Sequence, residues 1–130
     1  MKGIVSDLNA PMRVVPTTPD EWAAYVNDWC ERKGWNRDLV FEKMLMNLHS
    51  EITEAREEIR NGHGIDEIYS SATIADEGMA KPEGVPIELV DLLIRLLHIM
   101  AWRGWNIQAL LETKMAYNEK RPFRHGNKTC

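Results

Sequence analysis

The amino-acid sequence predicts an all-α fold with four main helices, and three observations lead to this prediction. Four stretches carry apolar residues at the three- and four-residue spacing of a helix. Residues that start and stop helices flank these stretches. No stretch shows the sustained alternation or the hairpin dipeptides that strands require. The length of 130 residues, with 44% apolar and 28% charged, is that of one ordinary globular domain. We expect a lead-in over 1–17 and a single helical domain over 18–128.

The first predicted helix runs from Thr18 to about Arg32. Thr18 is a suitable N-cap, Pro19 fits the first helical position, and Glu21 completes a capping box. Gly34 then ends the helix, because glycine readily adopts the left-handed conformation that follows a helix.

The second predicted helix is longer, from Leu39 to Arg60 with Asp38 as its cap. Glu51 and Glu54 lie together on one shoulder of its apolar stripe. A row of acids in this position usually faces water, so the pair alone does not indicate a site. The stripe that we expect to face the core consists of Phe41, Met44, Leu45, Leu48, Ile52, Ala55 and Ile59.

A long loop over 62–85, with at most a short helix near 65–75, leads to the third predicted helix, from Pro86 to about Gly104. Ten of the residues in 86–100 are Leu, Ile, Val or Met, which predicts that this helix is buried. On this helix alone, the remaining polar strip fits a buried site or a water-facing side equally well. The strip consists of Glu88, Asp91, Arg95 and His98.

The last predicted helix begins at the cap Asn106 and stops before Pro122. The final 18 residues carry five Lys or Arg and one Glu, although the whole chain has a net charge of −4. Lys114 and Asn118 are i, i+4 neighbours on this helix, and Arg121 follows its end. A lysine, an amide and a guanidinium group together suit phosphate binding.

The two central helices each carry a pair of acids three positions apart, Glu51 with Glu54 and Glu88 with Asp91. If the helices pack antiparallel, the pairs face one another across a groove. Four carboxylates without a cation raise one another's pKa and repel, whereas Mg²⁺ prefers such hard oxygen ligands. A di-iron centre would need Glu-x-x-His, and no glutamate lies three residues before any of the four histidines.

These acid pairs and the basic residues that follow them resemble the MazG-like all-α nucleoside triphosphate pyrophosphohydrolases. The segments 81–91 (KPEGVPIELVD) and 114–126 (KMAYNEKRPFRHG) are similar to the small stand-alone proteins of bacteria and phages. The resemblance extends from about Trp22 to Lys128. Ser50 stands where the first motif of the family often has an acid. The 33 residues between the two acid pairs exceed the usual spacer of the family, and we interpret them as a substrate loop.

The resemblance implies hydrolysis of a (deoxy)nucleoside triphosphate between its α and β phosphates, giving a monophosphate and pyrophosphate. It implies Mg²⁺, which Mn²⁺ can replace, bound by Glu51, Glu54, Glu88 and Asp91. One of the first two glutamates would accept the proton of the attacking water. The phosphates would be bound by Lys114, Asn118 and Arg121. Supporting positions would be Glu58, Arg95, Lys120, Arg124 and His125.

The aromatic residues are open to two interpretations. The tryptophans could stack on a base, but we expect core packing for most of them. They are Trp22, Trp29, Trp35 and Trp102. We expect His98 to satisfy a buried hydrogen bond and not to bind metal.

The expected partners are a nucleotide and further copies of the chain, as a homodimer or homotetramer, since members of the family are oligomeric. The acidic net charge argues against a nucleic-acid polymer as partner, and no apolar run is long enough for a membrane span. The distant cysteines Cys30 and Cys130 and the lack of a signal segment favour the cytoplasm. The alternative is a non-catalytic nucleotide-binding or regulatory protein with the same fold, an alternative that Ser50 leaves open.

Overall fold

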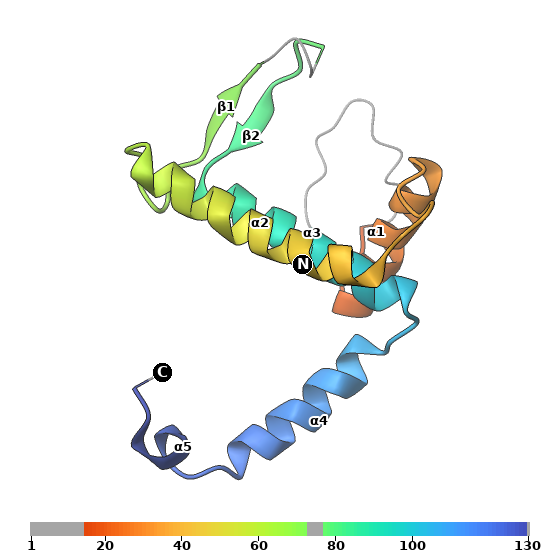
Figure 1. Cartoon of the computed structure of the whole chain (residues 1–130). Helices are drawn as coiled ribbons and strands as arrows, with labels where there is room; N and C mark the ends of the chain where they lie inside the picture. Colours follow the sequence, from red (N-terminus) through yellow and green to blue (C-terminus); the bar gives the residue numbers. More distant parts are fainter. Residues whose placement is uncertain (1–14, 73–76, 130) are drawn as a thin grey trace.

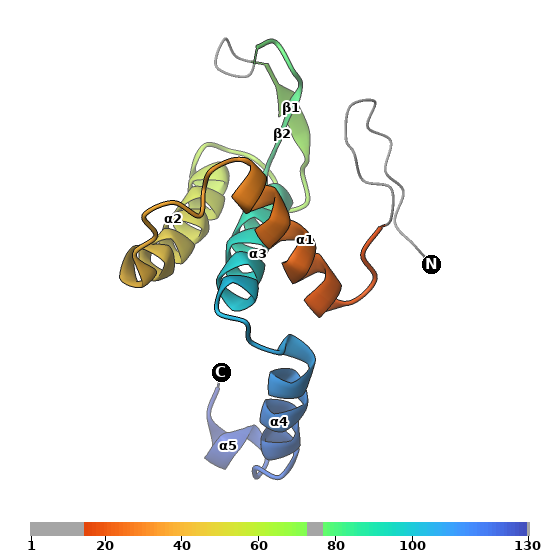
Figure 2. The same cartoon turned by 90° about the vertical axis from the view of Figure 1, so that its right-hand side faces the viewer.

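The computed structural model describes residues 15–72 and 77–129, and this part of the chain confirms the all-α class. Four long helices account for most of it, with a small hairpin between the second and the third (Figures 1 and 2). None of these helices combines the length and apolar character needed to cross a membrane. The elements are α1 Pro19–Arg32, α2 Phe41–Arg60, β1 Tyr69–Ser71, β2 Lys81–Glu83, α3 Val85–Trp102, α4 Ile107–Glu119 and α5 Arg124–Asn127. Most of the expected lead-in over 1–17 lies outside the described residues.

Helix α1 begins and ends where the sequence predicts. The side chain of Thr18 accepts a hydrogen bond from the backbone N–H of Glu21, and Pro19 occupies the first turn. The carboxylate of Glu21 accepts from the backbone N–H of Thr17, so the reciprocal bond of the capping box reaches one residue further back than expected.

Helix α2 begins two residues later than predicted. Its N-cap is Val40, which makes no capping bond through its side chain. Asp38, the expected cap, instead adopts a positive φ of 54° in the turn before the helix. An aspartate tolerates this conformation because its short polar side chain can bond locally. The end of the helix at Arg60 agrees with the prediction.

The segment expected to be a loop contains a two-stranded antiparallel hairpin, which corrects the prediction. Tyr69 pairs with Glu83, and Ser71 pairs with Lys81. The strands have only three residues each, too few to show an alternating pattern. The hairpin joins α3 through Gly84, where an added Cβ would lie 2.1 Å from the carbonyl oxygen of Glu67. Only glycine fits this close crossing of the two backbones.

Helices α2 and α3 lie side by side and run in opposite directions, and α1 packs on α3 from another side (Figure 1). The core is small and lies where α1, α3 and the start of α4 meet. Ala23, Leu97 and Ile107 are buried there, with Met100 and Ala101 packed against them. This antiparallel pairing of α2 and α3 brings the two acid pairs to the same region.

The prediction that 86–100 is a buried helix is wrong for the single chain. Within α3 only Leu97 and Ile99 are buried, and Leu93 remains 50% exposed. Apolar residues occur on two or three faces of α3, but α1 and α2 pack against only part of its circumference. Apolar residues therefore remain on the surface along α2 and α3.

Helix α4 extends away from the other helices (Figures 1 and 2). Asn106 caps it as predicted, by accepting from the N–H of Ala109. Asp20 of α1 also accepts from the N–H groups of Ile107 and Gln108, at 2.7 and 3.0 Å. These bonds attach its first turn to α1, and Ile107 is its only buried residue in the described chain. The one-turn helix α5 follows, and no helix was expected there from the sequence.

Candidate metal centre

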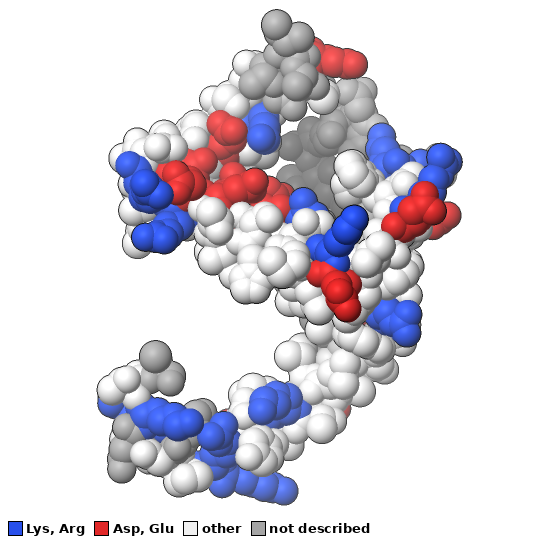
Figure 3. All heavy atoms as spheres, viewed as in Figure 1, with Lys and Arg blue, Asp and Glu red and all other residues white. Residues whose placement is uncertain are grey.

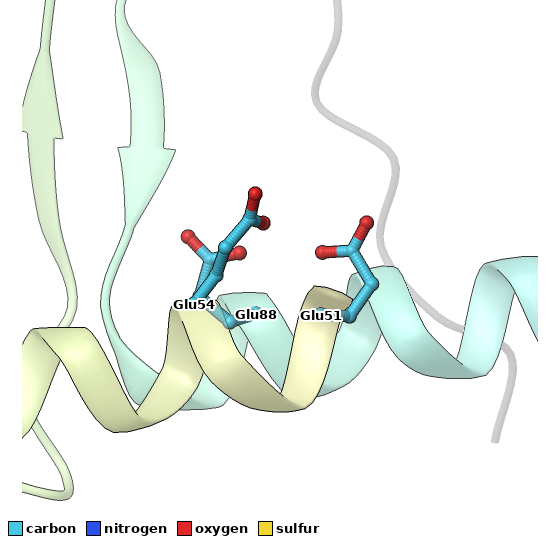
Figure 4. A group of neighbouring side chains, drawn as sticks. All are labelled: Glu51, Glu54 and Glu88. Carbon is cyan, nitrogen blue, oxygen red and sulfur yellow. The ribbon is translucent and has the colours of Figure 1, made fainter. Parts of the chain in front are cut away.

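Three glutamates gather where α2 and α3 run alongside each other. Glu51 and Glu54 stand one turn apart on α2, and Glu88 stands in the first turn of α3. One carboxylate oxygen of each lies within 4.8 Å of the other two (Figure 4). Helical spacing places the first two on one face, and the antiparallel packing brings the third opposite them. This confirms the predicted proximity for three of the four acids.

Glu51 is the buried member of this group, with 5% of its surface exposed. Its Oε1 accepts a hydrogen bond from Arg95 Nε at 2.5 Å. Its Oε2 is also buried and has no hydrogen-bond partner in the described part of the chain. A buried carboxylate oxygen without a donor is costly, and a cation between the three carboxylates would satisfy it. The residues present therefore fit a bound metal ion.

The pKa values report the same crowding of negative charge. Burial, followed by the charges of Glu54 and Asp91, raises the pKa of Glu88 to about 7. The Glu51 carboxylate raises the pKa of Glu54, because a protonated Glu54 can donate a hydrogen bond to it. Burial is the largest cause for Glu88 and the hydrogen bond the largest for Glu54, and in both cases the charge of a neighbouring carboxylate adds to the shift of the pKa. Binding of a divalent cation would reverse this effect.

Asp91, the fourth predicted ligand, is not in the group of three. It follows Glu88 by one turn of α3, and burial, then the charge of Glu51, raises its pKa. Its side chain lines the cavity described below, beside Arg95. Asp91 therefore lies next to the centre, but the carboxylate oxygens that lie closest together belong to the three glutamates.

Glu58 was expected to support the metal site, and the structure gives it a different contact. Both of its carboxylate oxygens accept from the hydroxyl of Tyr69, at 2.8 and 3.1 Å. This hydrogen bond raises the pKa of Tyr69 to about 12. Glu58 therefore attaches strand β1 to helix α2, one turn beyond Glu54.

The predicted phosphate-binding residues lie together on α4 and just past its end, not beside the glutamates. Lys114 Nζ and the Arg121 guanidinium lie over the ring of Tyr117, at 4.9 and 5.8 Å from its centroid. Asn118 is on the same helix and donates to the sulfur of Met115. Figure 3 shows the basic side chains of α4 and α5 well apart from the band of acids over α2 and α3.

The remaining supporting residues divide between the two regions. Arg95 is bound to Glu51 and belongs to the acidic centre. Lys120 and Arg124 are exposed on the α4–α5 segment, and Arg124 lies over the ring of Phe123. The side chain of His125 lies outside the described part of the structure.

A cavity of about 960 Å³ opens beside the acidic centre, between α1, α2 and α3. Trp22, Trp29 and Trp35 line it, together with Asp91 and Arg95. Trp35 is 63% exposed, so the expectation that most tryptophans pack in the core is wrong for these three. The sequence carried a signal for this wall, since the three tryptophans recur at intervals of six or seven residues across α1 and the turn after it.

His98 also lines this cavity, and it makes the hydrogen bond that the sequence predicted. Its Nε2 lies 2.6 Å from Asn36 Oδ1, and the amide of Asn36 donates to Asn27 and to Glu31. Burial, followed by the charge of Arg95, lowers the pKa of His98, so the ring is neutral at pH 7.

Comparison of the chain with protein-family models, with curated proteins and with solved structures gives no match.

Proposed function

We propose that the protein is a Mg²⁺-dependent, MazG-like nucleoside triphosphate pyrophosphohydrolase, which cleaves a (d)NTP between the α and β phosphates to (d)NMP and pyrophosphate. The observation that carries this proposal is the group of three glutamate oxygens within 4.8 Å, one of which belongs to the buried carboxylate of Glu51. An all-oxygen donor set selects a hard cation such as Mg²⁺ or Mn²⁺ over zinc or copper. A bound Mg²⁺ neutralises phosphate charge and makes water a better nucleophile.

The protein side chains take separate roles in this proposal. Glu51 is held in place by Arg95, so it serves as a fixed ligand. Glu54 is exposed on the same helix and can accept the proton of the attacking water. Glu88 and Asp91, both on α3, supply the remaining negative charge of the site.

The tryptophan-lined cavity supports a nucleotide as the substrate over a simple polyphosphate. It is apolar and aromatic, it is large enough for a nucleoside, and it adjoins the carboxylates through Asp91 and Arg95. A base bound there can stack on an indole ring while its phosphates reach the metal. The neutral ring of His98 offers a hydrogen-bonding group at the wall of this cavity.

A second copy of the chain would complete the site. Lys114, Asn118 and Arg121 form the proposed phosphate-binding set, and the basic side chains of α4 and α5 lie apart from the acids of α2 and α3 in one chain (Figure 3). Leu110 and Leu111 of α4 are each 49% exposed, and apolar side chains are also exposed along α2 and α3. Burial of these surfaces between copies would stabilise a homodimer or homotetramer. We therefore propose that α4 of one protomer supplies the basic residues to the acidic centre of its partner.

Product analysis tests the proposed function. The protein is incubated with canonical and modified dNTPs and Mg²⁺, and the products are separated by ion-exchange chromatography. The proposal expects nucleoside monophosphate and pyrophosphate in equal amounts, and no turnover with EDTA. Release of orthophosphate would indicate a different phosphatase chemistry. Binding without turnover would favour a nucleotide-binding or regulatory protein.

A further inference from the structure

We propose that His98 binds the base of the nucleotide through its ring Nδ1, which accepts a hydrogen bond and thereby selects a base with an exocyclic amino group, such as cytosine or adenine. This inference rests on the proposed function, and it names the class of base that the tryptophan-lined cavity takes. His98 is then the residue that determines specificity, and Asn36 is the residue that positions its ring.

The direction of the hydrogen bonds around Asn36 follows from its contact with Glu31. The side-chain nitrogen of Asn36 donates to Glu31 Oε2 at 2.9 Å and to Asn27 Oδ1 at 3.1 Å. An ionised carboxylate can only accept hydrogen bonds, so the nitrogen of this amide, and not its oxygen, faces Glu31. The amide oxygen is therefore the atom that faces His98.

This orientation fixes the position of the proton on His98. Its Nε2 lies 2.6 Å from Asn36 Oδ1. An amide oxygen has no proton to donate, so Nε2 carries the proton and donates it to this bond. Burial, followed by the charge of Arg95, lowers the pKa of His98, which keeps the ring neutral. Because a neutral imidazole has a single N–H group, Nδ1 presents a lone pair.

The acceptor Nδ1 is open to a ligand. Among the residues that the structure describes, Nδ1 has no hydrogen-bond partner, and Glu51 Oε2 is the one buried side-chain N or O atom that lacks a partner. Nδ1 is consequently exposed. His98 lines the cavity of about 960 Å³, whereas Asn36 lies outside its lining. The ring thus has its protonated nitrogen on Asn36 and supplies an accessible acceptor to the wall of the cavity.

The hydrogen-bonding groups of the bases decide what such an acceptor selects. Cytosine and adenine carry an exocyclic amino group, and one of its N–H groups can donate to Nδ1. Uracil and hypoxanthine carry a carbonyl oxygen at the same position, where two lone pairs would face each other. Trp29 and Trp35, which also line the cavity, offer ring faces to either kind of base. Stacking therefore binds bases in general, whereas His98 distinguishes between them.

Two pairs of deoxynucleoside monophosphates test this selection, by calorimetry with the full-length protein and Mg²⁺. The pairs are dCMP with dUMP and dAMP with dIMP. The members of a pair share their sugar and phosphate, so the ratio of their affinities reports the base alone. In the pair that binds more tightly, we expect the amino member to bind about 10-fold better, as for one hydrogen bond gained. Equal affinities in that pair, a preference for the oxo member, or no binding of any monophosphate would overturn the inference.

Substitution of His98 separates the roles of its two ring nitrogens. The amide nitrogen of glutamine can reach the place of Nε2, so His98→Gln keeps a donor for Asn36 but removes the acceptor Nδ1. The amino and oxo members should then bind equally well. His49→Gln is the control, because His49 is exposed on α2 and lies outside the lining of the cavity. A preference that persists in His98→Gln, or that His49→Gln abolishes, contradicts the role of His98.

Nitrogen-15 NMR of the histidine rings tests the positioning role of Asn36 without any ligand. The two neutral tautomers differ in the chemical shifts of their ring nitrogens, and we expect the proton of His98 on Nε2 in the unmodified protein. Asn36→Leu removes the accepting oxygen, so a mixture of tautomers and a smaller preference for the amino base should result. A proton on Nδ1 in the unmodified protein would overturn the inference, even if the variants fail to fold.

The outcome is distinguishable from that of the proposed function. A preference for dCMP or dAMP that depends on His98, in a protein that hydrolyses no dNTP, would support the selection of the base while rejecting the enzyme. Hydrolysis of dNTPs with equal affinities within each pair would reject the selection alone.

Discussion

The acidic centre and the basic α4–α5 segment are built in opposite ways. The glutamates come from two helices, and the packing of α2 against α3 brings them together. The basic residues come from one helix and its end, and helical spacing alone gathers them around Tyr117. The first arrangement needs tertiary structure, whereas the second needs only a helix. Consequently, packing within one chain brings the acids together, whereas the basic side chains of α4 and α5 lie apart from them (Figure 3).

The same contrast appears in the burial of the two regions. Glu51 is enclosed, and Arg95 holds it in a defined position. On α4, Ile107 is buried at the first turn, and Met115 further along is 50% exposed. Because the bonds from Asp20 hold α4 at its first turn, the rest of the helix can be repositioned when another surface covers it. Each of the following experiments tests this difference.

The largest expected effect comes from the acids themselves. Glu88→Gln and Asp91→Asn should each lower Mg²⁺-dependent turnover by roughly 10²-fold or more, because each removes negative charge from the site of the cation. Circular dichroism should show unchanged helix content. Glu57→Gln is the control, since Glu57 pairs with Arg60 at 2.9 Å on the same helix and lies outside the group. Full turnover in both variants would refute the site.

The Glu88→Gln variant also has a predicted effect on stability. The folded metal-free protein keeps a proton on Glu88 up to about pH 7, whereas the ordinary pKa is 4.5. Stability without metal therefore falls as the pH rises between these values, and the variant should lose part of this dependence. Thermal unfolding at pH 5 and pH 8 measures this difference. Added Mg²⁺ should raise the melting temperature of the unmodified protein more than that of the variant.

The second experiment mixes two inactive chains. Glu54→Gln damages the acidic centre, and Arg121→Gln damages the basic set. If α4 acts on the partner, mixing after partial unfolding and refolding restores about a quarter of the original activity, because half of random dimers are mixed and each has one intact site. If both sets act within one chain, mixed dimers contain no intact site and activity stays absent. Absent activity in the mixture would contradict the proposal that α4 of one protomer acts on the acidic centre of its partner.

The smallest effect concerns the attachment of α4. Asp20→Ala removes the acceptor for the N–H groups of Ile107 and Gln108, which should cost about 1 kcal/mol, as for loss of a helix cap. Hydrogen exchange at the start of α4 should accelerate while α2 and α3 stay protected. Asp28→Ala is the control, because Asp28 pairs with Arg32 on the exposed side of the same helix. Equal acceleration in both variants would show that Asp20 does not hold α4.

Much of the fold was predictable because its signals are local. Thr18, Pro19 and Asn106 act within one turn of their own helices, so the bounds of α1 and the start of α4 agree with the structure. The hairpin was missed because nine residues separate its strands and because contacts to other segments stabilise it. Tyr69 bonds to Glu58, a contact that depends on the packing of the hairpin against α2, and Gly84 meets the backbone of Glu67 at the base of the hairpin.

The acidic centre was predictable only in part. The i, i+3 spacing put Glu51 beside Glu54, and antiparallel packing was the condition for Glu88 to join them. Which of these acids is buried and which contacts each one makes could not be predicted, because both depend on how the helices pack. Glu51 is the buried acid, Asp91 lines the cavity, and Glu58 accepts a hydrogen bond from Tyr69.

The sequence by itself determined the helices, their caps and the residues that share a helical face, because these depend on neighbours within about four positions. Only the tertiary structure decided which acids meet, which tryptophans border a cavity and where the basic residues lie relative to the glutamates. Such relations depend on packing between segments far apart in the chain. Helix α3 illustrates this dependence: its apolar composition predicts burial, but α1 and α2 bury only part of its apolar surface in the single chain.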